Sequence, residues 1–348
     1  MPPSMQGIPL ARYESVCFPR DGAALASVLG VSGTTGFRVW QEGAVAAELH
    51  LGRWTGGDGA ALRRLLGRAG VVPDEIMDVE VFGSAAAGSR GAGVFVGTAA
   101  GGAMAPAGLY AGGTVFLCLN GPSFDGGTRG LLAERPGVVT FCVNNGGHGF
   151  RPDLWTCVDA PDRFMESIWA DGRISKFVPV EFFGKSSVRD APGPLVRERP
   201  NVWGYGRNDR FRAARFLREP TFNWGNHKSR GGGRSVMLVA LRIAWELGFR
   251  RVVLVGCDFR MSAEERYWFA EGRTDQAIRN NTTTYGILEG FFAELDPVLR
   301  EAGLRVVNAT PGSGLRAFPT VDLAEEVERA AIDTTDSTEG MYVPRASG

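Results

Sequence analysis

From residue 114 onward the chain alternates short, continuously apolar runs with glycine-containing turns and helical segments. The runs are residues 114–119, 138–143, 154–158, 252–255 and 304–307. Strands that are apolar on both faces belong to a parallel sheet covered by helices on both sides. The pattern therefore predicts an α/β fold with a Rossmann-like parallel sheet.

The clearest helix is predicted over residues 236–247, where apolar side chains recur every three to four positions. Ser235 is placed to cap it, and Gly248 to end it. A short turn then leads into the apolar run 252–255, which ends at Asp258. In open parallel sheets the ligand crevice lies outside the carboxyl ends of the strands, so we expect Asp258 to face a site.

The 348 residues exceed the length of one ordinary domain, and 44% hydrophobic with 22% charged residues are typical of a globular protein. We expect a small α+β domain of unknown role over residues 1–108, with strands near residues 37–40, 45–51 and 79–82. Residues 109–332 are expected to form one Rossmann-like domain that binds a nucleotide sugar and carries the catalytic site. An acidic, disordered tail is predicted over residues 333–348.

Five cysteines without a Cys-x-x-Cys pair favour free thiols in a reducing compartment. The first eight residues lack the apolar core of a signal peptide, and Arg242 interrupts the longest apolar run. We therefore expect a cytoplasmic protein with no membrane partner.

The chain has 38 basic and 38 acidic residues, yet residues 197–234 hold ten basic against three acidic ones. Aromatic residues are interleaved with these cations, which suits binding of phosphates or nucleic acid, although a solvated loop is the alternative. The side chains expected to bind the acceptor or phosphate are Arg207, Arg210, Arg212, Arg215 and Lys228, together with Tyr267 and Trp268 further on.

Three turns carry amides and glycines at strand or helix ends, where they could converge on one nucleotide. Asn120-Gly121-Pro122-Ser123 follows the first apolar run, and Ser123 is placed to cap the next helix. Asn144-Asn145 follows the second run, and Gly231-Gly232-Gly233-Arg234-Ser235 opens the long helix.

The order of these motifs over roughly residues 114–312 resembles the bacterial sialyltransferases that use a CMP-activated sugar. It also resembles a broader uncharacterised family that includes pyrophosphokinases of pterin synthesis. The resemblance implies that Asn120, Gly121, Ser123 and Asn144 or Asn145 contact the donor nucleotide. It places Gly233, Arg234 and Ser235 near the phosphate or base, and Asp258 beside the ribose or the reacting sugar.

The chain departs from that family at the catalytic histidine, because residues 280–285 read Asn-Asn-Thr-Thr-Thr-Tyr and no histidine follows His227. Glycosyl transfer to an alcohol needs a group that accepts the proton of the acceptor. Asp258 is our first candidate for this base, with His227 and Asp159 as alternatives; ribose binding is an equally good use of Asp258. No Asp-x-Asp pair is present, which favours a metal-free reaction in which arginines offset the charge of the leaving group.

These observations predict a metal-independent glycosyltransferase that moves a sugar from a nucleotide-sugar donor to a hydroxyl group. Members of the resembling family in phage genomes imply that the acceptor is a 5-hydroxymethylpyrimidine such as hydroxymethylcytosine in phage DNA, modified in the host cytoplasm. Two alternatives stay open: a diphosphotransferase that uses ATP and Mg²⁺, and a non-catalytic protein that binds a nucleotide or DNA.

Overall fold

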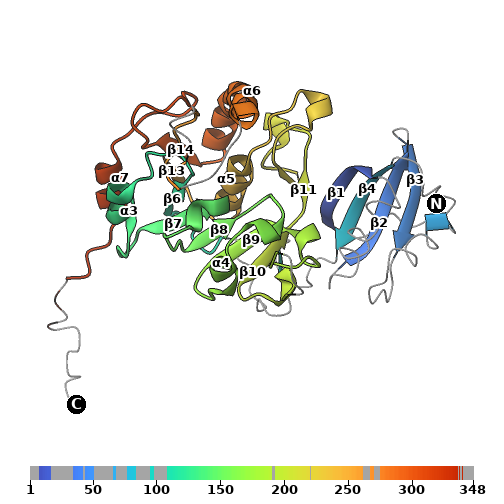
Figure 1. Ribbon diagram of the computed structural model, residues 1–348, viewed down its shortest axis with the longest axis horizontal. Coiled ribbons are helices and arrows are strands. Elements are labelled where there is room, and N and C mark those ends of the chain that lie inside the picture. The colour runs from blue at the N-terminus through green and yellow to red at the C-terminus, as the bar shows by residue number, and fades with distance from the viewer. Residues whose placement is uncertain are drawn as a thin grey trace, which may run out of the picture.

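An eight-stranded sheet forms the centre of the protein, as the computed structural model in Figure 1 shows. The structure describes residues 8–16, 34–41, 44–50, 66–67, 77–83, 95–97, 108–189, 193–219, 221–261, 267–269, 275–335, 337 and 339. The strand order is β14-β13-β6-β7-β8-β9-β10-β5, and all neighbours are parallel except β5 and β10. The predicted α/β class with a parallel sheet is thereby confirmed.

The seven parallel strands follow the chain in order, apart from one reversal. They are β6 (Thr114–Cys118), β7 (Val139–Val143), β8 (Leu154–Thr156), β9 (Ser175–Pro179), β10 (Val202–Tyr205), β13 (Arg251–Val255) and β14 (Arg305–Asn308). The chain adds strands to one side of β6 as far as β10, and then crosses to the other side of β6 to form β13 and β14. The order of addition therefore reverses between β6 and β13.

Alternate residues of each parallel strand pack into two separate cores, one on each face of the sheet. In β6, Val115 and Leu117 face one core, whereas Phe116 and Cys118 face the other. Helices α5 (Val236–Glu246) and α6 (Asp275–Glu301) cover the first face. The helices that cover the second face are α3 (Gly126–Leu132), α4 (Glu166–Ala170) and α7 (Leu323–Ala330).

The ends of the predicted helix agree with the structure, but the role of Ser123 does not. Ser235 Oγ accepts a hydrogen bond from Met237 N at the start of α5, and Gly248 follows its end with φ of 96°. Ser123 does not cap α3, because Asp125 occupies the N-cap and accepts from Thr128 N at 2.8 Å. The helix begins two residues later than the sequence suggests, which leaves the Ser123 hydroxyl free for another partner.

Sequence periodicity missed β9, β10 and α6. Strand β9 contains the charged Lys176, β10 contains Gly204, and α6 has many polar residues, so none of the three has a continuous apolar signal. The short strand β5 (Phe95–Gly97) pairs antiparallel with β10, so a strand that precedes residue 108 forms the edge of the large sheet.

A second, four-stranded antiparallel sheet has the order β1-β4-β2-β3. Its strands are β1 (Ile8–Val16), β2 (Thr34–Gln41), β3 (Ala44–His50) and β4 (Met77–Gly83). The strands expected near residues 37–40, 45–51 and 79–82 are confirmed. Figure 1 shows this sheet beside the large one, with β1 next to β11 (Arg207–Asn208), which pairs with β12 (Phe222–Asn223).

Four cysteines are buried and free, namely Cys118, Cys142, Cys157 and Cys257, as expected for unpaired thiols. The fifth, Cys17, lies outside the described residues, and so does most of the predicted tail over residues 333–348. No helix in the described part of the chain is long and apolar enough to cross a membrane.

Lys176 is a charged side chain in the middle of the sheet. It is 0% exposed, and its Nζ donates to the carbonyl oxygens of Asp171, Ile174 and Pro200 at 2.6, 3.0 and 3.0 Å. Burial lowers the pKa of Lys176 to about 8 from its usual 10.5, against the opposing effect of the Asp171 charge. The three carbonyls hold together the segments that precede β9 and β10.

We predict that Lys176 makes the free energy of unfolding rise between pH 8 and pH 10.5, the interval between its folded and usual pKa values. In that interval the unfolded lysine still holds a proton that the folded lysine has released, so higher pH favours the folded state. Urea unfolding of the wild type and Lys176→Met at a series of pH values measures this. The free energy of unfolding of the wild type minus that of Lys176→Met should increase with pH. Parallel pH curves for the two proteins, with equal m-values, would contradict the assignment.

Candidate functional site

A cleft of about 370 Å³ opens at the carboxyl ends of β6 and β13. These strands are neighbours at the point where the order of strand addition reverses, which is where open α/β sheets bind their ligands. Its polar and aromatic lining comprises Asn120, Asn144, Asp159, Trp224, Arg234, Ser235, Asp258, Phe259, Arg260, Tyr267, Asn281, Thr284 and Tyr285. Turns after the four strands β6, β7, β8 and β13, the start of α5 and one face of α6 thus form its walls.

The carboxylate of Asp258 is fixed by the turn after β6. Its side chain is 5% exposed, and its Oδ2 accepts hydrogen bonds from Ser123 Oγ at 2.7 Å and Ser123 N at 3.3 Å. Gly121 N also donates to Gly256 O at 2.9 Å, so the two turns interlock. Gly121 is required here because an added Cβ would lie 1.9 Å from Asp258 Oδ2 and 2.6 Å from Gly256 O.

The turn that carries Asp258 is itself supported from behind by residues 310–314. Thr310 Oγ1 accepts from Cys257 N at 2.8 Å, and Gly314 N donates to Asp258 O at 2.8 Å. Ser313 Oγ also donates to Cys257 O. The loop after β14 therefore holds the backbone of the Asp258 turn in place.

Two residues of the cleft adopt a left-handed backbone conformation without being glycine. Asn144 has φ of 48°, and Phe259, directly after Asp258, has φ of 54°. This conformation is unfavourable for a bulky residue such as phenylalanine. Strain of this kind persists only where surrounding contacts fix the backbone, and it is concentrated at functional sites.

Asn120 and Asn144 present carbonyl oxygens that lack hydrogen-bond partners among the described residues. Both Oδ1 atoms are buried, and both residues line the cleft after the neighbouring strands β6 and β7. A buried acceptor without a partner costs free energy, so a ligand or water that donates hydrogen bonds would stabilise both. These two side chains therefore favour a ligand with hydroxyl or amino groups.

The start of α5 gives part of the cleft lining the character of an anion site. Val236 and Met237, the first residues of α5, line the cleft beside Arg234, and the amides of a helix start carry partial positive charge. The preceding Gly231, Gly232 and Gly233 have φ of 99°, 69° and 82°. An added Cβ on Gly233 would lie 2.7 Å from Ile287 Cγ2, so glycine lets the loop approach α6 closely.

Several predicted site residues lie in the cleft, namely Asn120, Gly121, Asn144, Asp159, Arg234, Ser235, Asp258 and Tyr267. Ser123 belongs to the site through its hydrogen bonds to Asp258. Asp159 is half exposed, and its Oδ2 lies 3.8 Å from Arg163 Nη1. The structure thus brings both carboxylate candidates for the base into the cleft.

Other predicted residues do not line the cleft. His227 is exposed, and its Nδ1 lies 2.9 Å from Ser229 Oγ. Trp268 packs against the core, with the guanidinium of Arg129 4.3 Å from its ring centre. The remaining residues outside the lining are Asn145, Gly233, Arg207, Arg210, Arg212, Arg215 and Lys228.

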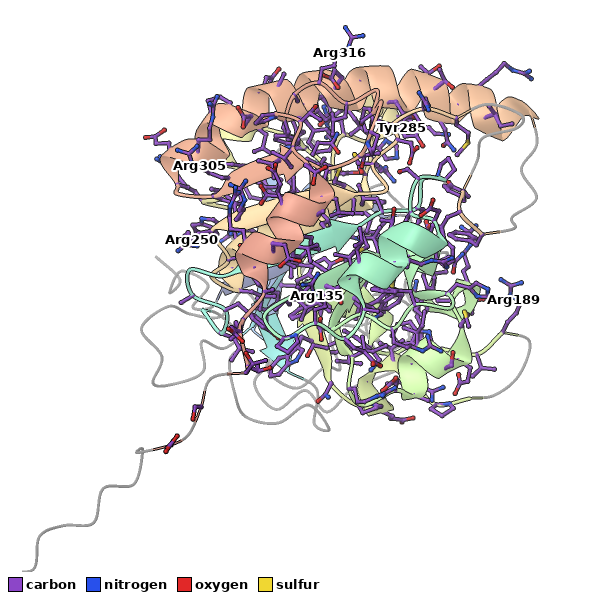
Figure 2. The ribbon with its side chains drawn as sticks, turned by 90° about the vertical axis from the view of Figure 1, so that its left-hand side faces the viewer. Arg135, Arg189, Arg250, Tyr285, Arg305 and Arg316 are labelled. Carbon is purple, nitrogen blue, oxygen red and sulfur yellow. The ribbon has the colours of Figure 1, made fainter. Side chains whose placement is uncertain are left out.

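Sequence reasoning missed the cleft residues supplied by α6. Asn281, Thr284 and Tyr285 lie on its cleft-facing side, in the stretch where the resembling family has its catalytic histidine. Tyr285 is labelled on this helix in Figure 2, and its ring packs 4.8 Å from that of Phe259. These residues recur at helical spacing, but they are polar, so the stretch has no apolar periodicity that would indicate a helix.

Cys257 lines the cleft but is poorly suited to be a nucleophile. Burial raises the pKa of its thiol, and the neighbouring Asp258 carboxylate raises it further. The thiol is therefore neutral at physiological pH. Within the part of the chain that the structure describes, no group of three His, Cys, Asp or Glu side chains is arranged to hold a metal ion.

Comparison with known proteins adds no relative to this description. No family model, no curated protein and no solved structure matches the chain.

We predict that Gly121→Ala lowers the free energy of unfolding by about 2 kcal/mol, because its methyl group would overlap Asp258 and Gly256 in a closely packed turn. Chemical denaturation measures the change. Gly130→Ala is the matched control, since Gly130 lies in α3 with no atom within 4 Å of an added Cβ. Alanine is favoured in a helix by about 0.5–1 kcal/mol, so the control should be slightly stabilised. An equal response of the two variants would contradict the interlocked turns.

Proposed function

We propose that this protein is a glycosyltransferase that transfers a sugar from a nucleotide-sugar donor to a hydroxyl acceptor without a metal ion. In this proposal residues 109–332, with β5 at the edge of their sheet, form a catalytic domain of the sialyltransferase-like type. The rest of residues 1–108 form a small α+β domain beside it, and the protein acts in the cytoplasm.

One observation carries the proposal, namely a single cleft whose lining combines hydrogen-bond acceptors with an anion site. Asp258, Asn120 and Asn144 offer acceptor oxygens, and Arg234 lies with the start of α5. A nucleotide sugar has groups complementary to both, since it carries hydroxyl-rich sugars and a phosphate. The volume of about 370 Å³ is in the range of small-molecule sites.

The proposed chemistry assigns different tasks to Asp258 and Arg234. Asp258 accepts the proton of the acceptor hydroxyl as the oxygen attacks the anomeric carbon, and the bond from that carbon to the phosphate oxygen breaks. The negative charge that develops on the departing phosphate is stabilised by Arg234 and the amides at the start of α5. Asp159 is the second candidate for the base, because it lies in the same cleft.

Ser123 is part of this proposal because it determines where the Asp258 carboxylate points. Its hydroxyl and amide both donate to Oδ2. Both hydrogen bonds from Ser123 are directed to Oδ2, and neither is directed to Oδ1. Oδ1 is therefore the oxygen that we assign to the proton transfer or, alternatively, to the ribose.

A screen for the donor tests the proposal most directly. The purified protein is heated with CMP-, UDP- and GDP-sugars, with ATP and with DNA. A ligand at about 100 times its dissociation constant adds about 2.7 kcal/mol to stability, which is visible as a higher melting temperature. Stabilisation by ATP with Mg²⁺ alone would favour the diphosphotransferase alternative, and binding without turnover would favour a non-catalytic protein.

We predict that Asp258→Asn lowers the transfer rate by about 100-fold or more, the usual range for loss of a general base, while the fold is retained. Radiolabelled sugar transfer and the melting temperature are the two measurements. Asp153→Asn is the matched control, because Asp153 Oδ2 also accepts from the amide and hydroxyl of one residue, Thr140, at 2.7 and 2.8 Å. It lies before β8, at the amino end of the sheet, and should transfer at the wild-type rate. Wild-type turnover by Asp258→Asn would exclude this base.

For the acceptor, we propose a 5-hydroxymethylpyrimidine in phage DNA, with exposed arginines of the 197–234 segment on the phosphate backbone. Arg215 lies in the short 3-10 turn Ala213–Arg215, and Arg212 directly precedes this turn. Both side chains are exposed. Arg230 and Arg234 lie 3.9 and 3.1 Å from the carboxylate of Asp209, which neutralises part of the local charge. Arg212 and Arg215 are therefore the exposed cations of the segment that we assign to contact with DNA, close together at one short turn.

We predict that replacing both Arg212 and Arg215 by Ala weakens binding to all DNA sequences alike and flattens the salt dependence by up to about two units, because each phosphate contact contributes a slope of roughly 0.9. Filter binding at several salt concentrations measures the slope. Arg305→Ala is the control, since Arg305 is exposed at the start of β14 and lies away from Tyr285 in Figure 2. Absence of DNA retention by the wild type at ~50 mM salt would rule out this acceptor.

A further inference from the structure

Four side chains form a continuous series that runs from the interior of the molecule to the cleft. Arg207 Nε lies 2.5 Å from Glu181 Oε1, and the Arg207 guanidinium lies 4.4 Å from the ring centre of Trp224. The guanidinium of Arg234 lies 4.5 Å from the same ring. The indole ring of Trp224 therefore contacts the guanidinium groups of both Arg207 and Arg234.

Only part of this series reaches the cleft. Trp224 and Arg234 line it, whereas Arg207 and Glu181 do not. The side chains of Arg207 and Glu181 are 19% and 9% exposed, and Arg207 Nη1 donates to Val158 O at 2.9 Å. Val158 also lines the cleft. Arg207 thus contacts two residues of the cleft wall, Val158 and Trp224, although it does not line the cleft itself.

We propose that Arg207 is a positioning residue, and not the phosphate ligand that the basic sequence segment suggests. It fixes the ring of Trp224, and through this ring it orients Arg234 in the wall of the cleft. The role of Arg234 in binding a phosphate rests on the function proposed above. The coupling between Arg207 and Arg234 does not.

The chemistry of arginine explains why this position needs a planar cation. A guanidinium can lie against an aromatic ring and still form hydrogen bonds in its own plane, here to Glu181 and Val158. A lysine ammonium keeps the charge but cannot make both kinds of contact at once. Glu181 balances the charge of Arg207, which a partly buried cation requires.

The orientation of Arg234 matters because a fixed guanidinium loses little freedom when it binds an anion. Asp209 holds Arg234 at 3.1 Å, and Trp224 supplies the second contact. The backbone agrees with this arrangement, because Ser235 N donates to Trp224 O at 2.8 Å. Movement of the Trp224 ring would therefore be transmitted to the residue that begins the anion site.

The first test needs no ligand. NMR signals of the Trp224 indole N–H and the Arg234 Nε–H are assigned through their loss in Trp224→Phe and Arg234→Lys. Arg207→Lys should shift both signals, whereas Arg212→Lys, an exposed change in the same basic segment, should shift neither. An unshifted Arg234 signal in a folded Arg207→Lys protein would overturn the proposal.

The second test measures the consequence for anion binding with inorganic pyrophosphate as the probe. Arg207→Lys should bind it roughly 3- to 10-fold more weakly than the wild type at an unchanged melting temperature, the effect expected for one cation–π contact. Equal binding by the two proteins would count against the positioning role. If the wild type binds no pyrophosphate, the proposed phosphate site fails, and the NMR shifts still decide whether Arg207 orients Arg234.

Discussion

The contact between the turns after β6 and β13 is the constraint on which the rest of the candidate site depends. Gly121 has no side chain, so the carboxylate of Asp258 can lie against its Cα, where Ser123 holds it with two hydrogen bonds. The amide of Gly121 binds Gly256 O in the same contact. A larger residue at position 121 would separate the two turns and displace the carboxylate.

This contact also explains how the strained backbone of Phe259 is tolerated beside the cleft. Phe259 adopts its left-handed conformation directly after a fixed residue, since Asp258 is bound by Ser123 at its side chain and by Gly314 N at its backbone. The backbone cannot relax without breaking these hydrogen bonds. A rigid turn of this kind is what a catalytic or ligand-binding carboxylate needs, because small displacements of reacting groups are costly.

The polarity of the cleft depends on which charged residues are paired with one another, and the overall composition does not show this. Basic residues are abundant between residues 197 and 234, but Glu181 and Asp209 pair with several of them. Arg234 is the member of the segment that both pairs with an acid and lines the cleft. The amide oxygens of Asn120 and Asn144 occupy the turns after two other strands, so the ligand meets acceptors and a cation in different places.

The sequence by itself determined the α/β class, five of the seven parallel strands, the bounds of α5 and the position of Asp258 at a strand end. These features follow from local apolar runs and from caps within a few residues, which a sequence displays directly. It could not give β9, where the buried charge of Lys176 is stabilised by carbonyls of the two segments that precede β9 and β10. Nor could it show that Ser123 binds a carboxylate 135 positions away instead of capping α3, or that α6 brings Tyr285 into the cleft. Only the tertiary structure decided these points, because each depends on contacts between segments that are separate in the chain. The contact between Ser123 and Asp258 forms when β13 crosses to the far side of β6 and pairs with it.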